Sequence, residues 1–188
     1  MQLTHEETMQ RIEQYERDAI LNYHFCKEKS YPYWIRIYKG EDQLVVVPLI
    51  TTVGWVFAEM DWFLRISQDS NAEEIGAAVL EAIDHIQVSP VDARTNQERE
   101  EDALYQKATN CKTYKDIAKK YYYCVVRYNE DGTYRVSQVR PTKRRGNGNY
   151  DFTPIELPVS ASTKEIGDAL LVSFTELEEY RCKALHLC

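Results

Sequence analysis

The sequence predicts an α+β fold in which two βββα units follow one another in a single domain with a mostly antiparallel sheet. Two observations predict it. The run Tyr31–Tyr38 (Tyr-Pro-Tyr-Trp-Ile-Arg-Ile-Tyr) matches Tyr121–Tyr128, 90 positions later, and the Glu-Ile-Gly run at 74–76 recurs at 165–167, 91 positions later. Because solenoids need at least about three repeats, two copies predict one pseudo-symmetric domain.

The chain divides into five segments of this one domain. They are an N-terminal helix over 1–29, a first unit over 31–86, a helical linker over 87–120, a second unit over 121–180 and a tail over 181–188. The length of 188 residues is enough for a single domain with a well-buried core. With 44% hydrophobic residues and no low-complexity segment, the composition is that of a globular protein.

The first unit has clear strand and helix signals. Strands are predicted at 33–38, at 43–49 and at 54–63, with a bend near Asp61 and a short fourth strand that ends at Ile66. The nearly unbroken apolar run in 43–49 predicts a central strand that is covered on both faces. Asn71 and Glu74 have the spacing of a capping box, and apolar residues at helical spacing follow as far as Ile86. We therefore predict a helix that lies on the sheet.

The second unit repeats this plan with more polar residues. It opens with a strand at 121–128, an Asp-Gly turn and an alternating strand, whereas 143–149 predicts a loop. Ser162 begins a second capping box and the last helix. Gly76 and Gly167 occupy the same place in the two helices, where glycine costs about 1 kcal/mol relative to alanine. We expect them to mark a close approach of helix to sheet.

The linker carries an acidic cluster. A capping box at Thr95 and Glu98 predicts a helix over 96–108, and a short helical turn is expected at 114–120. The acidic residues at the start of the first helix are Glu98, Glu100, Glu101 and Asp102. They form either a solvated helix face or a docking surface for a basic protein, because complementary charge steers association. The sequence leaves both interpretations open.

Charge and composition exclude several classes of protein. The net charge of −7 argues against a general nucleic-acid binder, whose surface is basic. No run approaches the roughly 18 apolar residues of a membrane span, and the N-terminus lacks the features of a signal peptide. Five cysteines, an odd number without paired spacing, fit reduced thiols. We therefore expect a soluble, cytoplasmic protein.

Residues for catalysis or metal binding do not form a recognisable set. The four histidines are scattered: His5, His24, His85 and His186. No nucleophile elbow, phosphate-binding loop or dinucleotide fingerprint is present. Cys182, His186 and Cys188 offer three soft ligands, but zinc needs a fourth, and a helix end with incidental thiols explains them more simply. We predict neither an enzyme nor a metal or other cofactor.

Two further features could bind a partner. The basic segment Arg140–Arg145 could contact phosphates, although a solvated hairpin loop has the same composition. Exposed aromatic residues are natural anchors of protein interfaces, and Trp62 and Tyr105 are the candidates for this role.

Several strings resemble a known family. Residues 31–38, 51–62 and 89–95, together with the two Glu-Ile-Gly helices, look like the immunity proteins of bacterial contact-dependent growth inhibition (CDI) systems. The resemblance covers residues 31–180. It implies a non-enzymatic cytoplasmic protein that binds the C-terminal toxin domain of a cognate exported effector. Toxins of these systems are often nucleases, and an acidic inhibitor suits a basic nuclease. The family has no catalytic residues to transfer.

Our first hypothesis is therefore a toxin-neutralising protein that occupies the toxin's active site or an adjacent face. The predicted toxin-binding residues are Glu98, Glu100, Glu101, Asp102, Trp62 and Tyr105. The alternative is a nucleic-acid-associated protein that uses the basic loop Arg140–Arg145.

Overall fold

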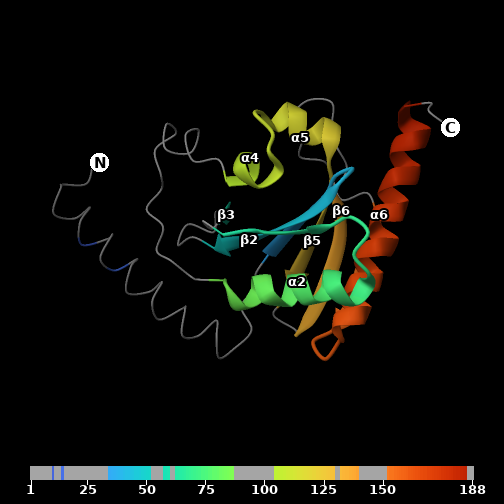
Figure 1. The fold of residues 1–188 in the computed structure, drawn as a ribbon. Coiled ribbons are helices and arrows are strands. Elements are labelled where there is room, and N and C mark those ends of the chain that lie inside the picture. The colour runs from blue at the N-terminus through green and yellow to red at the C-terminus, as the bar shows by residue number, and fades with distance from the viewer. Residues whose placement is uncertain are drawn as a thin grey trace, which may run out of the picture.

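The computed structural model describes residues 34–51, 57–59, 62–86, 104–129, 132–139 and 152–185, together with Gln10 and Gln14. In this part of the chain, helices pack on one antiparallel sheet, which confirms the predicted α+β fold (Figure 1). The predicted N-terminal helix over 1–29 and the predicted loop over 143–149 lie outside the described residues.

Seven strands form the sheet of the described residues. They are β1 (Trp34–Lys39), β2 (Gln43–Thr51), β3 (Phe57–Glu59), β4 (Leu64–Ser67), β5 (Tyr122–Tyr128), β6 (Thr133–Val139) and β7 (Ile155–Pro158). The order is β3-β2-β1-β5-β6-β7, and all neighbours are antiparallel. β4 pairs with residues 43–46 of β2, and β3 pairs with residues 49–51. These two short strands share one edge, which agrees with the short fourth strand expected from the sequence.

β1 and β5 lie at the centre of the sheet, and each opens one half of the fold. They pair antiparallel, with Trp34 opposite Arg127 and Ile37 opposite Cys124. In the first half, β1 is followed by β2, β3, β4 and the long helix α2 (Ala72–Asp84). In the second half, β5 is followed by β6, β7 and the long helix α6 (Thr163–Leu185). The predicted repeat of a βββα unit stays a prediction.

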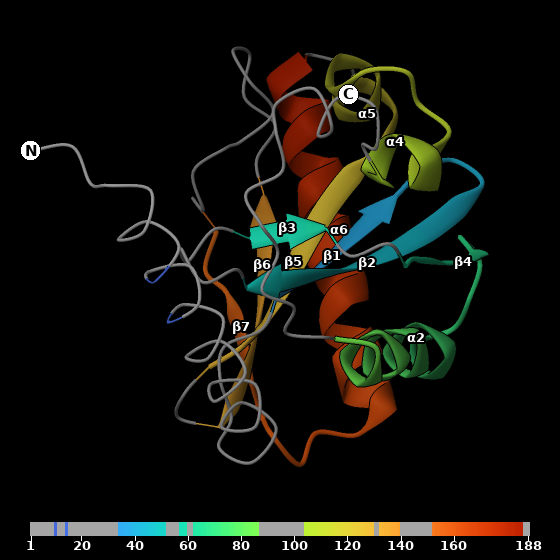
Figure 2. The same cartoon turned by 90° about the vertical axis from the view of Figure 1, so that its left-hand side faces the viewer.

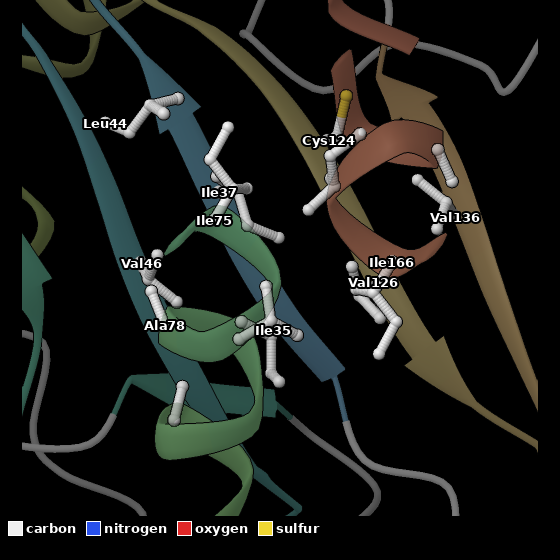
Figure 3. Packing of buried hydrophobic residues seen from close by; sticks show 14 of the residues in the cluster. Ile35, Ile37, Leu44, Val46, Ile75, Ala78, Cys124, Val126, Val136 and Ile166 are labelled. Carbon is white, nitrogen blue, oxygen red and sulfur yellow. The ribbon is translucent and has the colours of Figure 1, made fainter. Parts of the chain in front are cut away.

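The larger core lies between the sheet and the helices α2 and α6. Alternate side chains of the strands face these helices, because successive side chains of a strand point to opposite faces. Figure 3 shows Ile75 of α2 near Ile37 of β1, and Ile166 of α6 near Val126 of β5. Phe174 of α6 is fully buried in the same cluster. We call this side of the sheet the first face.

Two glycines allow α2 and α6 to touch. A Cβ atom on Gly76 would lie 1.7 Å from the backbone oxygen of Thr163, where α6 begins. A Cβ atom on Gly167 would lie 1.8 Å from the backbone oxygen of Ala72, where α2 begins. The contact is thus reciprocal. Our expectation that these glycines bring helix to sheet is wrong, because the close neighbour is the other helix in both cases.

Both long helices begin with the predicted caps. In α2, the Asn71 side chain accepts a hydrogen bond from the Glu74 N–H (3.0 Å), and the Glu74 carboxylate accepts one from the Asn71 N–H (2.9 Å). In α6, the Glu165 carboxylate accepts from the Ser162 N–H (2.7 Å), while Ser162 Oγ accepts from the Glu165 N–H (3.3 Å). These reciprocal bonds satisfy amide groups that a helix leaves without intrahelical partners.

The opposite side of the sheet, the second face, is covered at one end by two short helices. They are α4 (Leu104–Thr109) and α5 (Tyr114–Lys120), and Figure 1 shows them across β2 from α2. The bounds of α5 confirm the predicted helical turn. The smaller core under these helices contains the buried residues Tyr38, Val45, Val47, Ala108, Cys111, Ile117 and Tyr121. Because Val45 and Val47 are buried here while Leu44 and Val46 are buried on the first face, β2 is covered on both sides, as predicted.

Side-chain hydrogen bonds fasten α4 to the sheet. The Tyr121 hydroxyl donates to the Thr109 carbonyl (3.0 Å) and accepts from Gln43 Nε2 of β2 (2.8 Å). Arg65 of β4 donates through Nε to the Ala108 carbonyl (2.9 Å) and through Nη2 to the Lys107 carbonyl (2.6 Å). Arginine thus occupies carbonyl groups that the end of the helix leaves unsatisfied, at the end where the helix dipole favours positive charge.

Candidate functional site

The two predicted aromatic anchors lie on opposite faces of the sheet. Trp62 is partly buried against the first-face core, and its ring centre is 4.5 Å from that of His85, the C-cap residue of α2. Tyr105 of α4 packs against the second-face core, as Phe63 and Tyr123 also do. The structure therefore does not bring Trp62 and Tyr105 together on one surface.

The other predicted binding residues lie outside the part of the chain that the structure describes. They are the acidic residues Glu98, Glu100, Glu101 and Asp102 and the basic segment Arg140–Arg145. The described chain resumes at Leu104, two positions after Asp102, at the first residue of α4.

The candidate metal ligands are only partly described. Cys182 lies in the last turn of α6, while His186 and Cys188 are outside the described residues. Within the described ranges, no group of three or more histidine, cysteine, aspartate or glutamate side chains could hold a metal ion. Cys111 and Cys124 are free and buried, but Cys182 is disulfide-bonded, so the prediction of reduced thiols is wrong at Cys182.

None of the described helices is long and apolar enough to cross a membrane.

Several polar side chains lie between the sheet and α6, and the thiol of Cys124 among them is not a nucleophile. Burial raises the pKa of the Cys124 thiol well above its usual value, and the charge of Glu176 raises it further, while Lys39 opposes this effect. A thiol with a raised pKa stays protonated at neutral pH and is inert. Gln138, which is 1% exposed, donates through Nε2 to Glu176, and Lys39 forms an ion pair with Glu178 (2.7 Å).

The second face carries a row of residues that the sequence analysis did not select. Trp34 of β1 is in register with Arg127 of β5, and Arg127 is in register with Arg135 of β6. Their neighbours Ile35, Val126 and Val136 point into the first-face core, so the three side chains share the second face. All three are partly exposed. We call Trp34, Arg127 and Arg135 the arginine row.

The arginine row lies at the strand ends away from α4 and α5. Tyr38 and Tyr123, which are register partners on β1 and β5, pack in or against the core under these helices. Trp34 and Arg127 are the register pair at the opposite end of the same two strands. In Figure 2, α6 runs behind β1, β5 and β6, while α4 and α5 lie toward one end of these strands.

Among the described side chains, none forms an ion pair with either arginine of this row. The guanidinium carbon of Arg127 lies 5.4 Å from the centre of the Trp34 ring, which is a cation–π contact. Within the described part of the chain, Arg127 Nε is buried without a hydrogen-bond partner. Like charges directly opposite each other on neighbouring strands are destabilising. Arg127 and Arg135 have this arrangement.

Comparison with known proteins identifies the family. The sequence model of the CDI immunity proteins matches residues 33–176, which is most of the chain. This chain belongs to the CDI immunity protein family. The match confirms the resemblance that the sequence strings indicated, and it spans β1 to the middle of α6. A search of curated proteins finds no match.

Two solved structures share the fold of this CDI immunity family member. A protein of unknown function from Neisseria meningitidis has a TM-score of 0.63 at 20% identity and covers 79% of this chain and 96% of its own. A CdiA-CT/CdiI toxin and immunity complex from Yersinia pseudotuberculosis has a TM-score of 0.60 at 17% identity, with coverages of 77% and 97%. At these identities the likeness concerns the fold alone.

The residue types of the arginine row are suited to binding a partner. Arginine and tryptophan are the residue types that dominate interface hot spots. Strands were predicted over 33–38 and 121–128, but no binding residue was predicted on them, although Trp34, Arg36 and Arg127 alternate with apolar residues there. This alternation is visible in the sequence. The sequence does not show which strands pair with each other.

Proposed function

We propose that this protein is a cytoplasmic immunity protein that binds and neutralises the C-terminal toxin domain of a cognate CDI effector. The family match over residues 33–176 carries this proposal. The fold shared with a toxin and immunity complex from Yersinia pseudotuberculosis supports it. On this proposal the protein protects the cell that makes it by occupying its toxin, with no catalytic step of its own.

The proposed target is a basic nuclease domain. The net charge of −7 would accelerate its encounter with a basic partner and make the affinity fall with added salt. The residues proposed to supply the charge are Glu98, Glu100, Glu101 and Asp102, with Trp62 and Tyr105 as aromatic contacts. Because Trp62 and Tyr105 pack on opposite faces, a single toxin surface would contact only one of them, unless the toxin wraps around an edge of the sheet.

Co-expression tests the proposed function. The C-terminal domain of an exported effector encoded beside this gene is expressed with and without the protein, and growth and co-purification are measured. The proposal predicts growth arrest by the toxin domain alone, and rescue with a stoichiometric complex when both are present. Toxicity that this protein does not relieve, together with no complex, would contradict it.

The role of the acidic cluster has its own test. Replacement of Glu100 and Glu101 by lysine should slow association with the toxin domain and flatten its salt dependence, because long-range attraction governs the encounter. Replacement of Asp69 and Glu81 by lysine is the matched control, since both are exposed charges elsewhere on the described surface. Equal association rates for the two double variants would reject a charge-led contact through the linker and leave the immunity function intact.

A further inference from the structure

We propose that the arginine row of Trp34, Arg127 and Arg135 binds carboxylate side chains of the toxin domain. This inference rests on the proposed immunity function and adds a second contact of opposite sign to the acidic linker. The partner chemistry is an aspartate or glutamate on the surface of a folded protein.

Strand pairing places the two arginines next to each other. Residues in register on neighbouring antiparallel strands have Cα atoms about 4.5–5.5 Å apart and point to the same face. Arg127 and Arg135 form such a pair, and Arg127 is also paired with Trp34. One carboxylate is therefore within reach of two guanidinium groups.

Among the described residues, the two arginines of the row, Arg127 and Arg135, have no ion-pair partner. Glu156 of β7 is the register partner of Arg135, yet no ion pair joins them. The chain has 30 acidic residues against 23 basic ones, yet none of the acidic side chains that the structure describes forms an ion pair with either arginine. Repulsion between the two adjacent positive charges raises the free energy of the unbound protein. An anion on a partner would reduce this repulsion.

The side chain of Arg127 is ordered before a partner binds. Its guanidinium lies against the Trp34 ring, and side-chain order that exists before binding reduces the entropy lost on association. Its Nε–H is a buried donor without a partner among the described residues. Because this Nε–H is buried, an incoming carboxylate would accept its hydrogen bonds from the terminal nitrogens of the guanidinium group.

Charge favours a protein partner over a nucleic acid for this site. A phosphate group presents the same oxygen atoms to arginine as a carboxylate. A nucleic acid, however, is a polyanion and is repelled at long range by a chain of net charge −7. A carboxylate on a toxin domain of net positive charge meets no such barrier.

The test measures affinity and folding for the same variants. Arg127→Gln and Arg135→Gln are combined, and the dissociation constant for the purified cognate toxin domain is determined by calorimetry beside the thermal midpoint. We expect the affinity to fall roughly 10- to 100-fold, because each substitution leaves a toxin carboxylate without its donor. The thermal midpoint should stay unchanged or rise, since a like-charge pair is removed. Arg127→Lys, which keeps the charge but loses the fork of donors, should recover part of the affinity.

A matched control and a second reagent make the result specific. Lys115→Gln removes an exposed positive charge from α5 on the same side of the sheet and should leave the affinity unchanged. The toxin's own carboxylates are then replaced one at a time by the corresponding amides. At least one of these replacements should weaken binding to the wild type but have no further effect on the double variant, because the same contact is already lost.

The outcomes separate this inference from the function on which it rests. A wild-type protein that does not bind the toxin would overturn the proposed function and this inference with it. Wild-type binding with an affinity in the double variant within twofold of normal would overturn this inference alone. Binding of a short RNA or DNA duplex at physiological salt that is lost in the double variant would overturn the choice of a carboxylate partner.

Discussion

The two faces of the sheet differ although the same strands build both. On the first face, apolar side chains of β1, β2, β5 and β6 meet α2 and α6, and all members of this core are less than one-tenth exposed. On the second face, α4 and α5 cover only the end of the strands near Tyr38, and the other end carries the arginine row. Neighbouring residues such as Val126 and Arg127 therefore belong to different environments.

This difference assigns stability and binding to separate sets of residues. Side chains that point to the first face remove apolar area from water, which is the dominant favourable contribution to folding. Partly exposed arginines in register with each other contribute nothing comparable. Substitutions on the first face should change the free energy of unfolding, and substitutions in the arginine row should change the affinity for the partner.

The largest loss of stability is expected for Phe174→Ala. The Phe174 ring is fully buried in the first-face core, with Lys39 Nζ 5.7 Å from its centre. Its removal leaves a cavity and should lower the free energy of unfolding by about 3–5 kcal/mol, as measured by urea denaturation. Val172→Ala, two positions away but 50% exposed, is the control and should change it by less than about 0.5 kcal/mol. Equal effects of the two substitutions would contradict the assignment of the core.

The contact between α2 and α6 should be the next most sensitive point. Gly76→Ala and Gly167→Ala each place a Cβ atom less than 2 Å from a backbone oxygen of the other helix, so the helices must move apart. We expect each to lose about 2–3 kcal/mol. At an ordinary exposed helix position, alanine is about 1 kcal/mol better than glycine, and Ala77→Gly provides that reference. A stabilised Gly76→Ala protein would show that the helices do not touch there.

On the second face, Tyr121→Phe is expected to lower the free energy of unfolding by a smaller amount. This substitution removes the hydrogen bond donated to the Thr109 carbonyl and the one accepted from Gln43. The free energy of unfolding should fall by about 1–2 kcal/mol, because the Thr109 carbonyl left behind is buried and Gln43 is partly buried. Amide hydrogen exchange should accelerate in α4 and stay unchanged in α2, which belongs to the other face. Faster exchange in both helices would mean that the two cores are not independent.

The smallest effect concerns the cap of α6 and depends on pH. Hydrogen bonds from the Ser162 N–H and then from its hydroxyl lower the pKa of Glu165. A carboxyl group with a pKa lowered by folding stabilises the protein above its unfolded pKa, and this contribution disappears as the pH falls through the folded value. Glu165→Gln should therefore reduce the thermal midpoint slightly at pH 7 and have less effect near pH 3. An effect that grows on acidification would contradict this assignment.

Local sequence signals predicted the elements whose residues show regular spacing. The capping boxes at Asn71 and Ser162 located the starts of α2 and α6, and the segment 114–120 was predicted with the bounds of α5. β7 was expected only from the βββα plan, because Ile155–Pro158 is too short to give a period-2 pattern. The prediction for Gly76 and Gly167 was wrong because the packing of one helix against another depends on contacts between distant segments of the chain.

The candidate site was less predictable than the fold. The acidic cluster was identified from residues that are adjacent in the sequence. The arginine row consists of residues from three strands, and Trp34 is 93 positions away from Arg127. Its members become neighbours only through the pairing of β1 with β5 and of β5 with β6. A sequence pattern identifies each arginine separately. The binding chemistry of the row depends on the two arginines being adjacent in space.

Strand β5 stabilises the fold through the side chains on one face and is proposed to bind the partner through those on the other. The most direct test compares Val126→Ala with Arg127→Gln, which change adjacent residues of β5, by measuring urea denaturation and affinity for the cognate toxin domain. We predict that Val126→Ala lowers the free energy of unfolding by about 2 kcal/mol and keeps the affinity. Arg127→Gln should keep the stability and weaken binding. Loss of stability in Arg127→Gln with unchanged affinity would contradict the account.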